Sequence, residues 1–419
     1  MDRSKLTRNI LLGMMLGLLI GSLIHLMALD SQGIFSVYVV DGIFDVGGRV
    51  FIASLKLLVV PLVFVSLVSG ASNLAGEGNM GRIGIKAVGL YLVTTATAIS
   101  LALLIANLIN PGLGFNMAAA TEFVAKESPP LKQVIIDIFP TNPIQAMAET
   151  NMLQIIVFAI LLGVAITKAG AHGERLKETF NDWNEVVMRL VLMLMNVAPI
   201  GVFCLMVTLF SKMGFAAISK LIVYFMAVLV VLLVHFFVTY PLLIRFLAGL
   251  NPVRFYKKMM PVMAFAFSTS SSGATLPVTL ETVKKRLGVK NQVASFIIPL
   301  GATINMDGTA IMQGVATVFI AQAFNVDIGL GGYLMVILTA TMASIGTAGV
   351  PGVGLITLAL VLTQVGLPVE GIALIIGVDR LLDMTRTVVN VVGDATVATV
   401  VGRSEGQFDQ SIFDADSEG

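Results

Sequence analysis

Apolar residues fill long stretches of this chain, and short polar or basic connectors separate them. A helix needs about 20 apolar residues to cross a bilayer, and many of the stretches reach that length. They run roughly over residues 10–29, 43–73, 83–109, 151–169, 186–211, 219–248, 292–323 and 372–402. The pattern therefore predicts an all-α polytopic membrane protein with eight transmembrane helices.

Basic residues gather in the connectors on one side of this predicted topology. They precede the first span and follow the second, fourth and sixth, and they are Arg3, Lys5, Arg8, Arg82, Lys86, Lys168, Arg175, Lys177, Arg245, Arg254, Lys257 and Lys258. Because Lys and Arg favour the cytoplasmic side, these connectors and the amino terminus are expected to face the cytoplasm. The link 111–150 is then external, and the acidic, polar residues 404–419 are expected to form a solvated cytoplasmic tail.

One apolar stretch between two basic clusters does not fit a simple span. Met259–Val283 separates basic residues at 254–258 from others at 284–290, and both clusters are expected to face the cytoplasm. The stretch must then enter and leave by the same face, as a re-entrant hairpin over about 258–290 with Ser268–Pro277 at its tip. Serine hydroxyls and free N–H groups at membrane depth suit an anionic ligand. The alternative is an ordinary cytoplasmic loop between short helices.

A second interrupted pair follows along the chain. The seventh span contains the polar segment Gly301–Ala310, which would expose carbonyl groups in mid-membrane, as cation sites in transporters do. Residues 321–378 contain no Lys or Arg, which places their connections outside. Glycine-rich Ala343–Gly354 then predicts a second hairpin over about 334–370, entering from the outer face as a lid. Such inverted repeats are typical of alternating-access carriers.

Polar residues form a stripe on the eighth span. They recur at steps of three and four, which places them on one helix face, and they are Asp379, Asp383, Arg386, Thr387, Asn390 and Asp394. An ionised group at the bilayer centre costs at least ~2.5–3.5 kcal/mol unless it faces a partner, water or a ligand. One interpretation is a buried ion-pair network in which Arg380 and Arg386 neutralise two carboxylates and nothing binds. The aspartates outnumber the arginines, however, so an excess carboxylate requires a cation.

Composition supports a membrane protein and excludes several other classes. Hydrophobic residues make up 57% of the chain and charged residues only 12%, too apolar for a soluble globule of this length. The net charge of +1 argues against a strongly basic nucleic-acid binder. The single Cys204 and three scattered histidines provide neither a disulfide nor a Cys/His metal cluster. A serine hydrolase using Ser270–Ser272 would lack a nearby base, so we predict that the chain is not an enzyme.

Four motifs in order carry a family resemblance: SSSGATLP, NMDGTA, SIGTAGVPG and DMTRTVVNVVGD. Together they resemble the glutamate transporter family, the dicarboxylate/amino acid:cation symporters, over roughly residues 8–403. The resemblance implies a multi-pass homotrimer in the inner or plasma membrane that co-transports sodium ions with L-glutamate or L-aspartate. It also implies an elevator movement, in which a transport domain (83–110 and 218–403) slides against a scaffold (1–82 and 111–217).

The resemblance further implies a substrate site. Asp383 would receive the substrate's amino group, and Arg386 would pair with its side-chain carboxylate, which a guanidinium fork binds bidentately. Further hydrogen bonds to the substrate would come from hydroxyl, amide and backbone groups, supplied by Thr309, Thr387 and Asn390 and, for the main carboxylate, by Ser270, Ser271, Ser272, Val350 and Gly354.

Three sodium sites are implied in the same way. Their ligands are oxygen atoms, which suit a hard cation. The first site comprises Gly301, Asn305, Asn390 and Asp394; the second comprises Thr303, Met306, Ser344, Ile345 and Thr347; the third comprises Tyr91, Thr94, Thr95, Asn305 and Asp307. Without the resemblance, Tyr91, Thr94 and Thr95 would be read as ordinary helix-packing residues.

One departure from the family pattern leaves alternatives open. Archaeal relatives carry an arginine just before the tip serines, and animal relatives carry one directly after the aspartate that matches Asp383. Here Ser270 and Met384 occupy those positions, and Arg380 follows Asp379 instead. Potassium counter-transport therefore stays open. Alternatives are a proton-coupled glutamate/aspartate or dicarboxylate symporter and, from another class, an anion channel.

Overall fold

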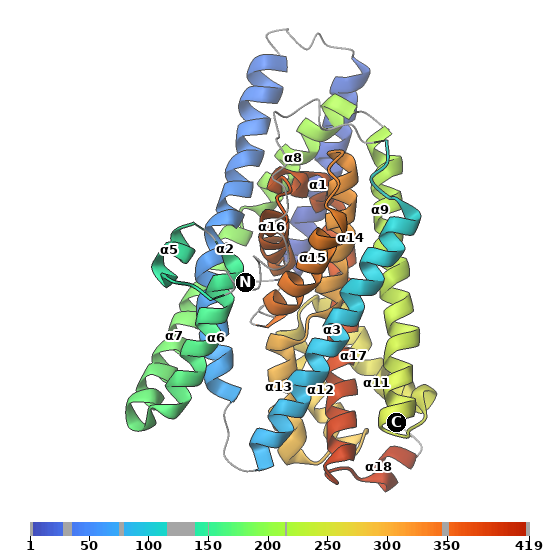
Figure 1. Cartoon of the computed structure of the whole chain (residues 1–419). Helices are drawn as coiled ribbons and strands as arrows, with labels where there is room; N and C mark the ends of the chain where they lie inside the picture. The colour runs from blue at the N-terminus through green and yellow to red at the C-terminus, as the bar shows by residue number, and fades with distance from the viewer. Residues whose placement is uncertain are drawn as a thin grey trace.

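The computed structural model describes residues 3–27, 36–74, 79–114, 139–149, 151–213, 216–345 and 352–415. These residues form helices and short connections, and the pairing of Val289 with Phe408 is an isolated bridge rather than a strand. The prediction of an all-helical protein is confirmed. Figure 1 shows an elongated bundle in which α5, α6 and α7 lie to one side, away from the helices of the carboxyl-terminal third.

The first group of helices packs around α2. Its members are α1 (Arg3–Leu26), η1 (Ser36–Phe44), α2 (Asp45–Leu74), α5 (Pro143–Ala148), α6 (Met152–Lys168), α7 (Gly170–Met195) and α8 (Ala198–Met213). Helices α6, α7 and α8 all contact α2, and α1 lies along α8. At Gly13 an added Cβ would lie 2.5 Å from the carbonyl oxygen of Pro199. Small residues thus let α1 approach the backbone of α8, as in other membrane helix pairs.

The fifth predicted span, 186–211, differs in the structure. It consists of two helices, α7 and α8, which meet at an angle of 47° around residues 196–197. Pro199 explains the break, because it lacks an N–H group and its ring clashes with the carbonyl four residues earlier. Helix α7 also begins 16 residues before the predicted span, at Gly170, and its first half carries charged, exposed side chains.

The second group of helices surrounds α17. Its members are α3 (Asn79–Ile109), α9 (Ala216–Val234), η3 (His235–Thr239), α10 (Tyr240–Leu242), η4 (Leu243–Leu247), α11 (Pro252–Thr269), α12 (Ser272–Lys285), α13 (Asn291–Ile304), α14 (Asp307–Ala323), α15 (Gly329–Ser344), α16 (Val353–Gln364), η5 (Val369–Gly371), α17 (Ile372–Ser404) and α18 (Gln410–Asp414). Helix α17 contacts α3, α9, α11, α12, α13 and α14, so most of its length is enclosed. The polar stripe therefore lies in the interior.

Two helix pairs occupy the regions where hairpins were predicted. Helices α11 and α12 pack together and meet at Ser270–Ser271. Helices α15 and α16 also pack together, and the tip between them, residues 346–351, lies outside the described part of the chain. In Figure 1, α12 lies in the lower half of the bundle and α15 and α16 lie in the upper half. The seventh predicted span is interrupted at Asn305–Met306, between α13 and α14.

Several helices are long and apolar enough to cross a membrane. Within the described residues they are Arg8–Leu26, Ser36–Ser72, Gly81–Ile109 and Leu221–Leu247, with the bent pair α7–α8 as a possible fifth. Shorter apolar helices cover Gln154–Lys168, Gly329–Ser344 and Val353–Gln364. Helix α17 is 33 residues long, but charged residues interrupt its apolar sequence. These features are consistent with a polytopic membrane protein.

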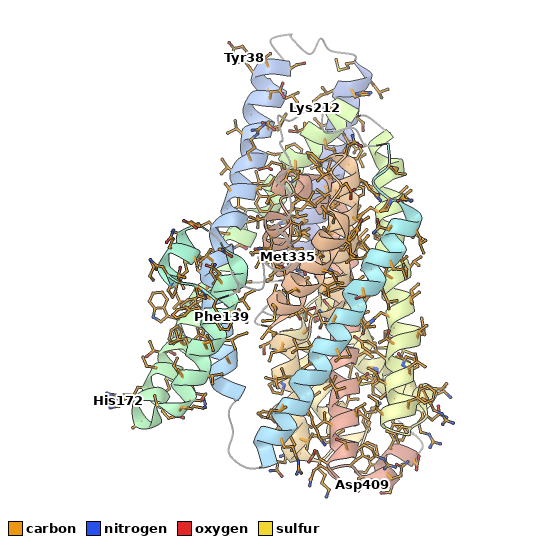
Figure 2. All side chains as sticks on the ribbon, in the orientation of Figure 1. Tyr38, Phe139, His172, Lys212, Met335 and Asp409 are labelled. Atoms are coloured by element: carbon orange, nitrogen blue, oxygen red, sulfur yellow. The ribbon has the colours of Figure 1, made fainter. Side chains whose placement is uncertain are left out.

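The end of the described chain is anchored to the bundle by hydrogen bonds and one buried ring. The Asp409 N–H donates to the Gly288 carbonyl at 2.7 Å, and the buried Lys258 ammonium donates to the Ile412 and Ala415 carbonyls, each at 2.9 Å. Phe413 is 1% exposed. Within residues 405–415 the polar side chains of Asp409, Gln410 and Asp414 are exposed, while Phe413 packs inward at the lower end of the molecule, where Figure 2 labels Asp409.

Ion pairs at the same end connect Glu405 to α3. Arg82 lies 2.5 Å from the Glu405 carboxylate, and Lys86 also pairs with it. These two cations, Lys86 foremost, hold the pKa of Glu405 below its usual range. Because the pKa of Glu405 is lower in the folded than in the unfolded protein, these ion pairs stabilise the fold above the unfolded pKa of about 4.3. The stabilisation is lost as the pH falls through the pKa of Glu405 in the folded protein.

We expect Phe413→Ala to release the docked segment. Removing a buried phenylalanine ring typically costs about 3–5 kcal/mol, and Phe413 is the buried side chain of α18. The amides of Lys290 and Asp409 donate to the Gln407 and Gly288 carbonyls and so join the segment to the bundle. Hydrogen exchange at these two amides is the measurement, and it should become much faster. Phe246→Ala, at a ring that is 76% exposed, is the control. Equal exchange in the two variants would show that Phe413 does not hold the segment.

Candidate functional site

Four charged side chains meet on α17, and we call them the charge quartet: Asp379, Arg380, Asp383 and Arg386. Arg386 Nη2 donates to Asp383 Oδ1 at 2.9 Å, and Arg380 Nη1 donates to Asp383 Oδ2 at 3.1 Å. Arg386 Nη1 also lies 2.9 Å from Asp379 Oδ1. Three residues of the predicted stripe and Arg380 thus bring two carboxylates and two guanidiniums into direct contact, which agrees with the ion-pair interpretation for these four residues.

The quartet leaves part of Arg386 unsatisfied. The side chain of Arg386 is 1% exposed, yet its Nε and Nη1 atoms have no hydrogen-bond partner among the described residues. Asp379 Oδ1 is close to Nη1 but is not aligned as an acceptor. Unpaired buried donors are costly, especially on a charged group. An anion with two oxygens would satisfy a guanidinium at this position.

Two glycines bring other helices against Arg386. A Cβ at Gly308, in the first turn of α14, would lie 2.5 Å from the Arg386 carbonyl oxygen. A Cβ at Gly354, in the first turn of α16, would lie 3.1 Å from Thr309 Cγ2 and 3.5 Å from Arg386 Nη1. Gly354 therefore lies beside both Thr309 and the Arg386 guanidinium.

A second polar group lies two turns further along α17, around Asp394. Asn305 Nδ2 donates to Asp394 Oδ1 at 2.9 Å and approaches the Asn390 carbonyl at 3.4 Å. A Cβ at Gly301 would lie 2.4 Å from Asp394 Oδ1 and 2.6 Å from the Tyr91 hydroxyl. The four residues predicted for the first sodium site are therefore neighbours, with Tyr91 beside them. We call Gly301, Asn305, Asn390 and Asp394 the Asp394 cluster.

The Asp394 cluster contains a buried carboxyl group without a basic partner among the described residues. Asp394 is 2% exposed, and no Lys or Arg of the described residues pairs with it. The buried Asn305 Oδ1 atom also has no partner there. Burying a carboxylate without a counter-charge is highly unfavourable. A cation held by the Asp394 carboxylate and the Asn305 amide oxygen would satisfy both groups.

Asp307 collects a third set of polar partners. Thr95 Oγ1 donates to Asp307 Oδ1 at 2.7 Å, and Thr94 Oγ1 approaches the same atom at 3.4 Å. On the other carboxylate oxygen, the Tyr240 hydroxyl donates at 3.0 Å and His235 Nε2 lies at 3.2 Å. Thr94, Thr95 and Asp307 thus meet as predicted for the third sodium site. Tyr91 instead donates to the Ile297 carbonyl at 3.2 Å.

The second predicted sodium set is only partly within the described residues. The Met306 N–H donates to Ser344 Oγ at 3.0 Å, and Ser344 Oγ donates to the Ile304 carbonyl at 2.7 Å. Ile345 follows Ser344 and is buried. Thr303 donates to the Leu300 carbonyl in its own helix at 2.9 Å. Thr347 of this set, and Val350 of the substrate set, lie outside the described residues.

The tip of the first hairpin contains the three predicted serines. Ser270 has a φ of 49°, a left-handed conformation that is strained for a residue with a side chain. Its buried hydroxyl has no partner among the described residues. Ser271 caps α12 by accepting from the Ala274 N–H at 3.2 Å, and Ser272 is buried. Helices α11 and α12 pack on α17, so this tip lies in the same part of the bundle as the polar stripe.

Two further predicted residues, Thr387 and Asn390, form hydrogen bonds inside the bundle. Thr387 Oγ1 donates to the Asp383 carbonyl at 2.8 Å. Asn390 Oδ1 accepts from the Gly308 N–H at 2.7 Å, and Asn390 Nδ2 approaches Met306 Sδ at 3.4 Å. Among the described residues, no three His, Cys, Asp or Glu side chains form a metal-binding group. Any cation here would therefore rely on hydroxyl, amide and carbonyl oxygens beside single carboxylates.

Comparison with known proteins identifies the family. The model of the sodium:dicarboxylate symporter family matches residues 6–404. The chain belongs to this family. It is 34% identical over 419 residues to the proton/glutamate-aspartate symporter of Escherichia coli (strain K12), covering 96% of this chain and 93% of that protein.

Two other relatives are named for a different cation or a different substrate class. It is 33% identical over 370 residues to the proton/sodium-glutamate symport protein of Bacillus subtilis (strain 168), covering 86% of each chain. It is 34% identical over 397 residues to the neutral amino acid transporter A of Homo sapiens, covering 84% of this chain and 74% of that protein. These proteins are transporters, so the predictions of the family and of a non-enzyme are confirmed.

Two residues that contact the Asp307 carboxylate, His235 and Tyr240, were not predicted from the sequence. Both lie where α9 continues into η3 and α10, and both are fully buried. Their signal in the sequence was weak, because each is a single polar residue in an apolar span and neither belongs to a periodic stripe. A buried ionisable residue in such a span is nevertheless a functional-site hypothesis by default.

Proposed function

We propose that this member of the sodium:dicarboxylate symporter family is a secondary active, cation-coupled symporter of L-glutamate and L-aspartate. The observation that carries the proposal is the buried Arg386 guanidinium, whose Nε atom has no hydrogen-bond partner among the described residues and whose Nη1 atom is held there by the ion pair with Asp379. A buried, incompletely satisfied fork at membrane depth suits a substrate with a side-chain carboxylate. The names of the Escherichia coli and Bacillus subtilis relatives agree with this substrate class.

Substrate binding would rearrange the charge quartet. The side-chain carboxylate of the substrate would replace Asp379 and Asp383 on Arg386, and its ammonium group would bind the Asp383 carboxylate released from that contact. Gly354 lies beside both Thr309 and Arg386, so Thr309 and Gly354 would face the same substrate. Thr387, Asn390, Val350 and the serines Ser270, Ser271 and Ser272 would complete the site. In this scheme the ion pairs of the quartet would neutralise its charges when no substrate is bound.

Sodium ions are the proposed co-transported cations. The Asp394 carboxyl group and Asn305 Oδ1, neither of which has a cationic partner among the described residues, support one site, with Gly301 and Asn390. The Asp307 group supports another, with Thr94, Thr95 and Tyr91, and Thr303, Met306, Ser344, Ile345 and Thr347 would form the remaining site. Oxygen-only ligands of this kind suit sodium. Proton coupling is the second candidate, because the Escherichia coli relative bears that name.

The proposed transport mechanism is an elevator in a homotrimer. Eight spans and two re-entrant hairpins would form a scaffold, 1–82 with 111–217, and a transport domain, 83–110 with 218–403. The grouping of helices around α2 and around α17 supports this division. The opposite positions of α12 and of α15–α16 in Figure 1 support hairpins that enter from opposite faces.

The same proposal places both termini on the cytoplasmic side of the inner or plasma membrane. Basic side chains gather at the lower end of the molecule, where Arg82 and Lys86 pair with Glu405 and Lys258 holds the last described residues. That end would face the cytoplasm under the positive-inside rule. Tyr38 and Lys212, labelled at the upper end in Figure 2, would lie toward the outside.

Equilibrium binding of L-aspartate to the purified protein tests the substrate class and the cation together. Removing sodium at constant ionic strength should weaken aspartate binding by orders of magnitude, because cation and substrate bind cooperatively. Unchanged affinity would contradict sodium coupling, and affinity that rises only on acidification would favour the proton-coupled candidate. Stronger displacement of labelled aspartate by succinate than by L-glutamate would instead indicate a dicarboxylate carrier.

A further inference from the structure

Arg380 has no role in the proposed binding scheme, although it is buried in the charge quartet. Its Nη1 atom donates to Asp383 Oδ2 at 3.1 Å, and Arg386 occupies Asp383 Oδ1. Each oxygen of Asp383 therefore has its own guanidinium. When a substrate takes Arg386 from Asp383, the contact with Arg380 can persist, because it uses the other oxygen.

The surroundings of Arg380 provide little screening of its charge. A small cavity beside Arg380, Asp379 and Asp383 is walled by apolar side chains of α1, α2 and α8, including Ile10, Phe51 and Val202. All three of these side chains are carbon only, and Arg380 itself is buried. Coulomb interactions are several-fold stronger in such an environment than in water. The charge of Arg380 therefore acts on any ligand held by the quartet.

Charge counting shows which ligands depend on Arg380. The empty quartet holds two carboxylates and two guanidiniums, so its net charge is zero. An acidic amino acid adds two carboxylates and one ammonium, so it adds one negative charge, whereas a neutral amino acid adds none. Without Arg380 the empty quartet would already be negative, and an acidic ligand would bring a second negative charge into a buried site.

We propose that Arg380 is a specificity-determining residue that selects acidic over neutral amino acids by keeping the empty quartet electrically neutral. The inference rests on the proposed function and adds a residue to it. A merely structural role for Arg380, such as fixing the Asp383 side chain, has a different consequence. Acidic and neutral amino acids both present an ammonium group to Asp383, so disturbing that side chain would weaken both to the same extent.

L-aspartate and L-asparagine test the proposal, because they differ in the side-chain charge and little in size. The measured quantity is the ratio of their affinities for the purified protein at saturating cation. In Arg380→Gln this ratio should fall at least about tenfold, through a loss of aspartate affinity with asparagine changed less than about twofold. Arg380→Lys, which keeps the charge, should retain the ratio within about threefold.

Two further variants sharpen the test. Arg189→Gln removes an arginine that is 74% exposed on α7 and should leave the ratio unchanged. Asp379→Asn combined with Arg380→Gln restores a neutral quartet and should recover most of the aspartate affinity that Arg380→Gln loses. If Arg380 acts through its charge, the double variant should regain aspartate affinity. If Arg380 acts only through packing, it should not.

The outcomes separate this inference from the proposed function. Wild-type protein that prefers aspartate, together with an unchanged ratio in Arg380→Gln, would overturn the role of Arg380 alone. A parallel loss of both ligands in Arg380→Gln would also overturn it, because that result indicates a structural residue. Wild-type protein that binds asparagine as well as aspartate would overturn the proposed function, and the role of Arg380 with it.

Discussion

Arg386→Gln should abolish measurable binding of L-glutamate and L-aspartate. The substitution removes the fork that would bind the substrate carboxylate and leaves Asp379 and Asp383 with Arg380 as their sole guanidinium among the described residues. Truncating one partner of a buried, hydrogen-bonded charge pair costs about 2–5 kcal/mol or more, which is at least about 30-fold in affinity. Isothermal titration of the purified variant with aspartate measures the effect.

Two comparisons show whether the loss comes from the guanidinium itself. Arg386→Lys keeps the charge without the planar fork and should bind aspartate more weakly than wild type but better than Arg386→Gln. Arg189→Gln removes a distant, exposed arginine and should bind as wild type does. Undiminished glutamate binding in Arg386→Gln would remove Arg386 from the substrate site.

Asp394→Asn should uncouple substrate binding from the cation. The amide has the same shape and can still accept from Asn305 Nδ2, which now donates to Asp394 at 2.9 Å. The negative charge that would attract a cation is lost, so the sodium concentration needed for half-maximal aspartate binding should rise at least about tenfold. The measurement is a sodium titration of aspartate affinity in the purified variant.

A matched exposed aspartate controls for the loss of charge. Asp182, which lies exposed on α7, can be changed to Asn without touching the bundle interior, and its sodium titration should match wild type. An Asp394→Asn protein with an unchanged sodium dependence would mean that the Asp394 carboxylate does not take part in cation binding. The buried carboxyl group in the Asp394 cluster would then need another explanation.

The helical fold was predictable because the apolar stretches of this chain are long and sharply bounded. The break between α7 and α8 was visible in principle, since Pro199 stands inside the predicted span, but the apolar run continues across it. Docking of residues 405–415 was not predictable. It combines main-chain hydrogen bonds such as Asp409 to Gly288, which leave no mark in the sequence, with contacts of Glu405 and Phe413 to residues far away along the chain.

The site was predictable where contacts are local. Asp383 and Arg386 are three residues apart on one helix, so the period of the helix alone brings them together. Asp394 and Asn305 are 89 residues apart, and they were placed together only through the family motifs. His235 lies 72 residues from Asp307 and belongs to none of those motifs. Pairing across such distances depends on how α9, α14 and α17 pack, which periodicity does not specify.

Uptake into liposomes, with sodium and proton gradients imposed separately, tests the central claim most directly. The claim is that the buried polar groups of α17 bind an acidic amino acid and a cation in the same cycle. An inward sodium gradient should drive concentrative, saturable uptake of labelled L-aspartate, and an inward proton gradient without sodium should not. Uptake that follows the aspartate gradient alone under both conditions would show that no cation is coupled, and would contradict this account.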